Sequence, residues 1–213
     1  MEQGRLASLR REYGLDELSE SEVAADPIAQ FQSWFHEALA RGCQDPNAMV
    51  LSTVSAEGRV HSRVVLLKNF DYGGFVFYTN YESPKARDME KHTQVALLFF
   101  WPELERQVRI EGIAEKVSAL ESNEYFETRP LEAKWSAWAS AQSEVIPSRQ
   151  YLEKKFMEIK EKFGEKVPRP DFWGGYRVRP DYFEFWQGRP NRLHDRIAYK
   201  LCQGAWQIQR LSP

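Results

Sequence analysis

The 213-residue sequence has only two cysteines, Cys43 and Cys202, and four histidines. Two cysteines cannot build a disulfide framework or a cysteine-rich zinc site, and the histidines lack the HExxH spacing of zinc hydrolases. No GxGxxG or GxxxxGK[ST] motif is present, so neither a Rossmann dinucleotide site nor a P-loop is indicated. We therefore predict no metal site, and a bound phosphate would have to be held by side chains.

Long apolar runs and an excess of one charge are also missing. The longest apolar run, Val95 to Trp101, is far shorter than the roughly 20 residues that span a bilayer, and the first residues lack the apolar stretch of a secretory signal. Lys and Arg number 29 against 31 Asp and Glu, a formal net charge of −2, so no basic field attracts nucleic acid or an anionic membrane. The sequence predicts a soluble, cytoplasmic protein that binds neither.

The spacing of apolar residues predicts one domain of α+β class, mainly β, over residues 26–213. Residues 1–25 carry no clear periodicity, so we expect a mobile arm with a short helical piece around Leu6–Tyr13. Asp26-Pro27 is an N-cap followed by proline at the first helical position, which predicts a helix to Gly42. Six or more short antiparallel strands follow, as in a small barrel or sandwich.

Turn residues divide the rest of the chain into strands and helices. The first three strands are joined by hairpin-type links, and an antiparallel meander is their simplest arrangement. Later strands are expected to turn at Pro180 and at Cys202–Gly204. Helices are expected over 83–92, from the capping box at Ser118, and from Pro147. Strands are predicted at 48–54, 60–70, 75–80, at 94–101 paired with 105–118, and in WGGYRVRP, YFEFWQG, RIAYKL and AWQIQRL.

Several cations are candidates for phosphate binding, because arginine offers a planar bidentate fork and lysine a point charge. Arg63 and Lys68 lie five apart in a predicted strand, hence on opposite faces and among apolar neighbours. Lys85 lies near a helix start, and Tyr125 and Arg129 are four apart on one predicted helix face. Taken singly, each is more commonly a solvated surface charge.

The sharpest cluster is Trp186-Gln187-Gly188 followed by Arg192-Leu193-His194-Asp195-Arg196. On an extended segment Arg192, His194 and Arg196 would project to one face and form a row of side chains that can bind an anion. The alternative is a polar strand face with an ion pair to Asp195. Between two guanidinium groups the pKa of His194 should be lowered, which favours the neutral imidazole.

In chain order these motifs resemble the pyridoxine/pyridoxamine 5′-phosphate oxidase family, from Leu9 to Pro213. The resemblance implies an antiparallel FMN-binding split β-barrel with surrounding helices, and a homodimer with FMN sites at the subunit interface. It implies oxidation of pyridoxamine 5′-phosphate or pyridoxine 5′-phosphate to pyridoxal 5′-phosphate in vitamin B6 metabolism, with O2 as acceptor and H2O2 released. The matching stretches include LRREY (9–13), SRVVLLK (62–68), FVFYTN (75–80), ERQVRIEG (105–112), YFETRP (125–130), EFWQG (184–188) and NRLHDR (191–196).

The resemblance also implies roles for particular residues. Arg192 and His194 would be catalytic, lying over the pyridine ring, and Arg196 would place positive charge near the flavin. The implied substrate-binding residues are Arg10, Tyr13, Lys68, Tyr125, Arg129, Arg192 and His194. The implied FMN-binding residues are Arg63, Val64, Val65, Leu66, Leu67, Lys68, Tyr78, Thr79, Lys85, Gln107, Gln142, Ser143, Trp186 and Arg196.

Two departures from the family pattern concern phosphate. Pro84 stands where the family usually has arginine, and Ala133 where it usually has serine, followed by Lys134. One lost charged hydrogen bond costs about 1.5–3 kcal/mol, so we expect weaker phosphate binding unless Lys134 compensates. Three alternatives stay open at this point: an FMN oxidoreductase of another pathway, like the phenazine-biosynthesis relatives, a non-catalytic carrier of FMN or pyridoxal phosphate, and aromatic residues that serve only a dimerisation surface.

Overall fold

The computed structural model describes residues 11–213, which form two compact units. Unit 1 comprises the chain up to Met49 together with Leu97–Glu111 and Asp181–Pro213, and unit 2 comprises Val50–Ala96 and Gly112–Pro180. The helical piece expected around Leu6–Tyr13 falls mainly outside the described residues, and residues 11–13 are not helical. The single domain at 26–213 and the mobile arm stay predictions.

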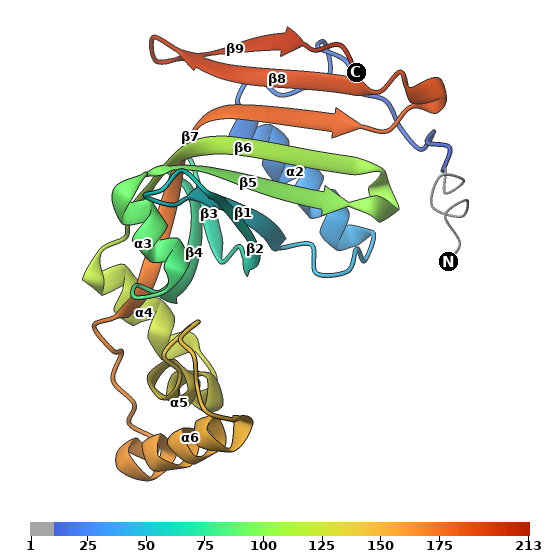
Figure 1. Ribbon diagram of the computed structural model, residues 1–213. Helices are drawn as coiled ribbons and strands as arrows, with labels where there is room; N and C mark the ends of the chain where they lie inside the picture. The colour runs from blue at the N-terminus through green and yellow to red at the C-terminus, as the bar shows by residue number, and fades with distance from the viewer. Residues whose placement is uncertain (1–10) are drawn as a thin grey trace. The chain divides into compact units, whose positions relative to one another are not determined.

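The described residues contain five α-helices and a sheet of nine strands (Figure 1). The helices are α2 (Pro27–Ala40), α3 (Pro84–Lys91), α4 (Ala119–Thr128), α5 (Leu131–Ala139) and α6 (Arg149–Phe163). The strands are β1 (Ala48–Val54), β2 (Val60–Leu66), β3 (Asn69–Asp71), β4 (Gly74–Asn80), β5 (Gln94–Trp101), β6 (Arg106–Lys116), β7 (Trp173–Gln187), β8 (Asp195–Cys202) and β9 (Ala205–Arg210).

The strand order is β2-β1-β5-β6-β7-β4-β3, with β8 on β7 and β9 on β8. The pairings β3–β4, β4–β7, β7–β8 and β8–β9 are antiparallel. The mainly β class and the pairing of β5 with β6 are thus confirmed. The meander holds only in part: β1 pairs with β2 and β3 with β4, but the strand predicted at 60–70 is split into β2 and β3, and β4 also pairs with β7.

Strand β7 is continuous through Pro180, so the turn expected there was wrong. The register with β4 ends at Val178 and the register with β8 begins at Tyr182. Because Pro180 falls between these two partners, its missing N–H removes no ladder bond from that edge. Gly112 of β6 permits a close backbone approach here, since a Cβ on it would lie 2.1 Å from the Arg179 carbonyl oxygen.

Unit 1 forms around α2 and the β8–β9 hairpin. The Asp26 carboxylate caps α2 by accepting the N–H groups of Ile28 and Ala29, as the sequence predicts. Trp34 of α2 packs edge-on against Phe185 of β7 at 5.2 Å between ring centroids. The hairpin turns at residues 203–204, where both φ angles are positive, and this turn is confirmed.

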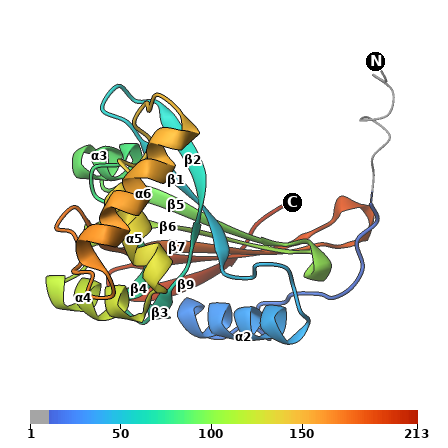
Figure 2. The ribbon, with the colours of Figure 1, turned by 90° about the horizontal axis from the view of Figure 1, so that it is seen from below.

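Unit 2 carries the remaining helices. Phe126, Trp135, Val167 and Trp173 form a buried cluster that joins α4 and α5 to β7, and α5 and α6 lie side by side (Figures 1 and 2). The Ser118 hydroxyl caps α4 as predicted, by accepting the N–H of Glu121. Helix α5 was not predicted. No helix among residues 11–213 is long and apolar enough to cross a membrane, and the cytoplasmic location stays a prediction.

Candidate functional site

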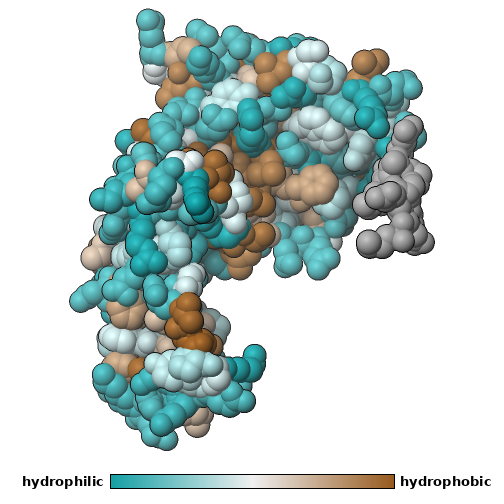
Figure 3. Space-filling model, in the orientation of Figure 1, coloured by the Kyte–Doolittle hydropathy of each residue, from teal (hydrophilic) through white to brown (hydrophobic). Residues whose placement is uncertain are grey.

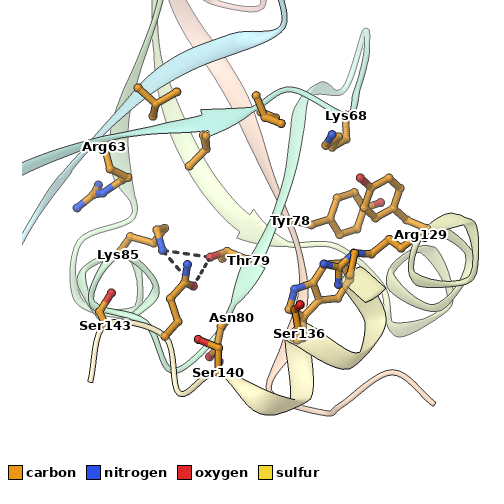
Figure 4. Close-up of a pocket in the computed structure, with 18 of the residues that line it drawn as sticks. Arg63, Lys68, Tyr78, Thr79, Asn80, Lys85, Arg129, Ser136, Ser140 and Ser143 are labelled. Carbon is orange, nitrogen blue, oxygen red and sulfur yellow. Dashed lines mark hydrogen bonds between the residues drawn. The ribbon is translucent and has the colours of Figure 1, made fainter. Parts of the chain in front are cut away.

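Unit 2 contains a cavity of about 890 Å³ whose wall carries four cations, Arg63, Lys68, Lys85 and Arg129. In Figure 4 Arg63 and Lys85 lie at one end, with Ser143, and Lys68 and Arg129 at the other. Residues from β2, β4, α3, α5, the C-terminal end of α4 and the start of β7 supply most of the lining. The cavity therefore has two positively charged ends and aromatic and aliphatic walls between them.

Lys85, in the first turn of α3, is the most buried of these cations, with 7% of its surface exposed. Its Nζ donates to Thr79 Oγ1 at 3.2 Å, to Ser83 Oγ at 3.1 Å and to Gln142 Oε1 at 3.4 Å. No carboxylate of the described residues forms an ion pair with it. Burial, aided by the charge of Arg63, lowers the pKa of Lys85 to about 8. A buried ammonium with only neutral partners is an incomplete site that suits an anion.

Arg63 on β2 is held in place by β1. Its Nη1 donates to the Leu51 carbonyl at 3.0 Å and to Thr53 Oγ1 at 2.8 Å. Its Nη2 lies 3.9 Å from the Asp88 carboxylate, which also accepts from Thr53 at 2.6 Å. Burial lowers the pKa of Arg63, but a guanidinium stays charged at any physiological pH. Arg63 is a fixed positive group beside Lys85.

Aromatic rings form the other end. Tyr78 stacks on Tyr125 at 3.9 Å, and the Arg129 guanidinium lies 4.5 Å from the Trp173 ring centroid. Arg129 Nη1 is buried without a hydrogen-bond partner, and burial lowers the pKa of Arg129. Burial also raises the pKa of Tyr78 to about 12, so this phenol stays a hydrogen-bond donor. An unsatisfied guanidinium N–H beside tyrosine hydroxyl groups fits a phosphate.

Two of the expected placements need correction, although the residues concerned do line the cavity. Arg129 is the extended C-cap of α4 and not part of the helix, so it does not share a helix face with Tyr125. β2 ends at Leu66, before Lys68, so the alternation of a strand does not separate Lys68 from Arg63. Lys134 pairs with Glu127 at 2.9 Å and is not in the lining, so it does not compensate for Ala133.

A second group of the expected residues lies in unit 1. His194 Nδ1 accepts the N–H of Arg189 at 3.0 Å, and its ring contacts Trp186 at 4.7 Å and Tyr13 at 5.7 Å between centroids. Burial, followed by the charge of Arg192, lowers the pKa of His194 while Asp195 opposes the shift. The neutral imidazole expected from the sequence is therefore favoured, with burial as the larger cause.

The prediction that Arg192, His194 and Arg196 form a row on one extended segment was wrong. Asn191 and Arg192 have left-handed φ values of 56° and 62°, and β8 begins only at Asp195. Arg196 donates Nε to Glu184 at 2.8 Å. Asp195 pairs with Arg210 at 2.7 Å and with Arg189 at 3.5 Å. Arg192 therefore lies in a tight turn and not in an extended segment with His194 and Arg196.

The structure sorts the expected site residues into these two groups. Leu67 is buried outside the lining of the cavity, and Arg10 lies outside the described residues. Lining residues that the sequence did not indicate include Asn80, Trp173, Ser136 and Ser140. The expected residues that line the cavity are Arg63, Val64, Val65, Leu66, Lys68, Tyr78, Thr79, Lys85, Tyr125, Arg129, Gln142 and Ser143, and those in unit 1 are Tyr13, Gln107, Trp186, Arg192, His194 and Arg196.

The chain is similar to several known proteins. The pyridoxine/pyridoxamine 5'-phosphate oxidase of Cupriavidus taiwanensis is 57% identical over 210 residues, which cover 98% of this chain and 99% of that protein. The protein of the same name from Thermosynechococcus vestitus is 53% identical over 209 residues, with the same coverage. PhzG from Burkholderia lata 383, solved with tetrahydrophenazine-1-carboxylic acid, superposes with a TM-score of 0.89 at 28% identity, covering 94% of this chain and 100% of PhzG.

An FMN binding protein of Nostoc punctiforme, described as pyridoxamine 5'-phosphate oxidase-related, has a TM-score of 0.70 at 16% identity over 86% of this chain and 97% of its own. This likeness concerns the fold, and together with the sheet it confirms an antiparallel split β-barrel with surrounding helices. Residues 35–163 match the pyridoxamine 5'-phosphate oxidase family, and residues 173–213 match the pyridoxine 5'-phosphate oxidase C-terminal dimerisation region. The chain belongs to the pyridoxamine 5′-phosphate oxidase family, and this membership supports FMN as its cofactor.

Proposed function

We propose that this chain oxidises pyridoxamine 5′-phosphate or pyridoxine 5′-phosphate to pyridoxal 5′-phosphate. The amine reaction consumes O2 and water and releases ammonia and H2O2, and the alcohol reaction consumes O2 and releases H2O2. The observation that carries the proposal is one cavity with a cation at each end that has no carboxylate partner among the described residues. The buried Lys85 ammonium bonds only neutral oxygens, and Nη1 of Arg129 is buried without a hydrogen-bond partner. Two such ends suit two phosphates, one of the cofactor and one of the substrate.

The end around Lys85 fits the phosphate of FMN. Lys85 and Arg63 supply charge and the Ser143 hydroxyl supplies a directional donor, while the Thr79 hydroxyl donates to Gln142 Oε1 at 3.2 Å. Val64 and Leu66 in the lining provide apolar surface for a flat ring. When bound there, FMN supplies the two-electron redox chemistry of the reaction, with O2 as the final acceptor. The protein residues hold and orient the reactants.

The other end fits the substrate phosphate. Arg129 has an unpaired N–H to offer, the Tyr125 hydroxyl is a directional donor, and the exposed Lys68 adds a point charge. Trp173 under the guanidinium limits its movement. These groups favour a phosphorylated substrate over its dephosphorylated form.

We also propose that the protein works as a homodimer with FMN sites at the subunit interface. The match of residues 173–213 to a dimerisation region supports this. A row of apolar side chains on β2 is exposed in the single chain, with Val60 at 71%, Val64 at 65% and Leu66 at 43%. Figure 3 shows hydrophobic side chains exposed near the middle of the view. Burying such a row in a second copy would remove it from water.

The likeness to PhzG supports one alternative, an FMN oxidoreductase acting on a phenazine precursor. The phosphate-binding end with Lys68, Tyr125 and Arg129 argues against it. The test is O2 consumption by FMN-loaded protein with pyridoxamine 5′-phosphate, with pyridoxamine, and with tetrahydrophenazine-1-carboxylic acid. Turnover of the phosphorylated amine with aldehyde formation supports the proposal, whereas turnover of the phenazine precursor alone contradicts it.

FMN affinity is expected to depend on pH through Lys85. A phosphate dianion favours the ammonium form, and in the free protein the pKa of Lys85 is lowered to about 8. FMN binding should therefore be strongest below pH 7 to 8. Above that range Lys85 is neutral and must take up a proton when FMN binds, so the FMN affinity should fall by up to about tenfold per pH unit. Titrations of FMN fluorescence between about pH 6.5 and 9.5 measure this.

The matched control for this pH dependence is Lys85→Arg, because a guanidinium does not deprotonate in that range. The variant should show a flat FMN affinity where the wild type declines. Parallel pH curves for both proteins would mean that Lys85 does not contact the FMN phosphate.

A further inference from the structure

Glu105 is a buried acid in unit 1 that none of the roles assigned above uses. It follows the short 3-10 turn at Pro102–Leu104 and precedes β6, and only 3% of its surface is exposed. Its φ of 54° lies in the left-handed region, which side chains other than glycine rarely adopt. A buried carboxylate in this conformation must be held by strong partners.

The side chain of Glu105 binds the amino-terminal arm. Its Oε2 accepts the backbone N–H of Gly14 at 2.8 Å and that of Leu15 at 3.1 Å, and its Oε1 lies 3.2 Å from Arg11 Nη2. Hydrogen bonds from N–H groups to an ionised carboxylate are among the stronger ones in proteins. The carboxylate thus holds the arm on both sides of Tyr13.

The backbone of Glu105 binds the segment that carries Trp186. Its carbonyl oxygen accepts the N–H of Gly188 at 2.8 Å, and Gln187 Nε2 lies 3.4 Å from the same oxygen. One residue therefore contacts both the arm, through its carboxylate, and the Trp186–Gly188 segment, through its carbonyl.

Tyr13 lies where these two segments meet. Its ring packs edge-on against Trp186 and His194, each 5.7 Å away between centroids. A Cβ on Gly188 would come within 2.8 Å of the Tyr13 ring, so glycine is needed for this approach. The ring therefore completes an aromatic cluster beside His194, at a distance that depends on how the arm is held.

We propose that Glu105 is a positioning residue that holds Tyr13 against Trp186 and His194 and thereby sets the affinity for the pyridine substrate. The link to substrate rests on the proposed function, but the holding of the arm does not. Residues beyond Leu15 have anchors of their own, since Asp16 pairs with Arg106 at 2.6 Å and the Leu18 N–H donates to Asp195 at 3.1 Å. Loss of the Glu105 carboxylate should therefore loosen residues 11–15 alone.

The test compares Glu105→Gln with Glu103→Gln. Glu103 lies on the same turn and is exposed, and its carboxylate interacts with the Gln44 N–H at 3.4 Å and with the Cys43 thiol rather than with the arm. In Glu105→Gln we expect hydrogen–deuterium exchange in residues 11–15 to accelerate about tenfold. The KM for pyridoxamine 5′-phosphate should rise about tenfold with kcat within about twofold, and Glu103→Gln should match the wild type. Unchanged exchange in residues 11–15 would overturn the proposal.

A double-mutant cycle separates positioning from general damage. If Glu105 acts through Tyr13, the rise in KM caused by Glu105→Gln should largely vanish in a Tyr13→Ala background, and an equal rise in both backgrounds would overturn the role. If Glu105→Gln does not fold, Gly14→Pro takes its place, because this substitution removes one of the N–H donors that Glu105 binds. Gly14→Pro should raise the KM in the same way, and an unchanged KM would overturn the positioning role of Glu105. If the wild-type protein shows no oxidase activity, the proposed function is refuted. The hydrogen–deuterium exchange of residues 11–15 would still show whether Glu105 holds the arm.

Discussion

Lys85→Met is expected to weaken FMN binding roughly 10- to 100-fold, the value of a charge-assisted hydrogen bond. Lys85 lies buried among neutral oxygens at one end of the cavity, so its charge has no counter-ion among the described residues until an anion binds. Quenching of flavin fluorescence on titration measures the affinity. Lys91→Met is the matched control, because Lys91 is an exposed lysine at the other end of the same helix.

The same substitution should stabilise the protein without FMN. Burial lowers the pKa of Lys85 from 10.5 to about 8, so the folded state binds this proton less tightly than the unfolded state does. The resulting penalty is fully present below pH 8 and disappears as the pH rises to 10.5. Removing the ammonium at pH 7 should raise the stability of the apoprotein by about 1–3 kcal/mol, seen as a Tm several degrees higher. A lower Tm together with unchanged FMN affinity would contradict the role given to Lys85.

Arg129→Met is expected to raise the KM for pyridoxamine 5′-phosphate roughly 10- to 100-fold while leaving the kcat/KM for pyridoxamine nearly unchanged. The guanidinium lies over Trp173 with one N–H unsatisfied, so methionine keeps the apolar contact and removes only the phosphate donor. Steady-state rates with both amines measure the difference. An equal loss with both substrates would mean that Arg129 supports the structure and not phosphate recognition.

Lys134→Met is the control for this variant. Lys134 lies five residues along the chain and carries the same charge, but its ammonium pairs with Glu127 outside the cavity lining. The variant should therefore leave both KM values within about twofold of the wild type. A large effect would instead support the compensation for Ala133 that the sequence suggested.

Local signals in the sequence predicted the parts of the fold that depend on few residues. The Asp26-Pro27 cap begins α2, the Ser118 hydroxyl caps α4, and the turn after Cys202 joins β8 to β9. Each is a short-range hydrogen-bonding or φ preference that acts in almost any context. Arg63 and Lys68 were likewise visible because they lie among apolar residues, whereas Lys85 was noted for its place near a helix start and Arg129 for its spacing from Tyr125.

The errors arose where long-range contacts decide the local structure. Pro180 looked like a turn, but it lies where neither β4 nor β8 needs its N–H. Helix α5 packs its Trp135 into the unit 2 cluster, which the sequence of WSAWAS did not reveal. Had that helix been recognised, Ser136 would have fallen on the same face as Ala133, toward the cavity. The left-handed residues 191–192 broke an alternation that assumed extended backbone.

The half-reaction with FMN under anaerobic conditions tests the proposed oxidase most directly. Protein loaded with FMN is mixed with pyridoxamine 5′-phosphate without oxygen, and the flavin absorbance near 450 nm is followed, with pyridoxamine as the dephosphorylated control. We expect the absorbance to bleach with the phosphorylated amine and to return with pyridoxal 5′-phosphate and H2O2 when air is admitted. Bound FMN that neither pyridoxamine 5′-phosphate nor pyridoxine 5′-phosphate bleaches would contradict the oxidase function.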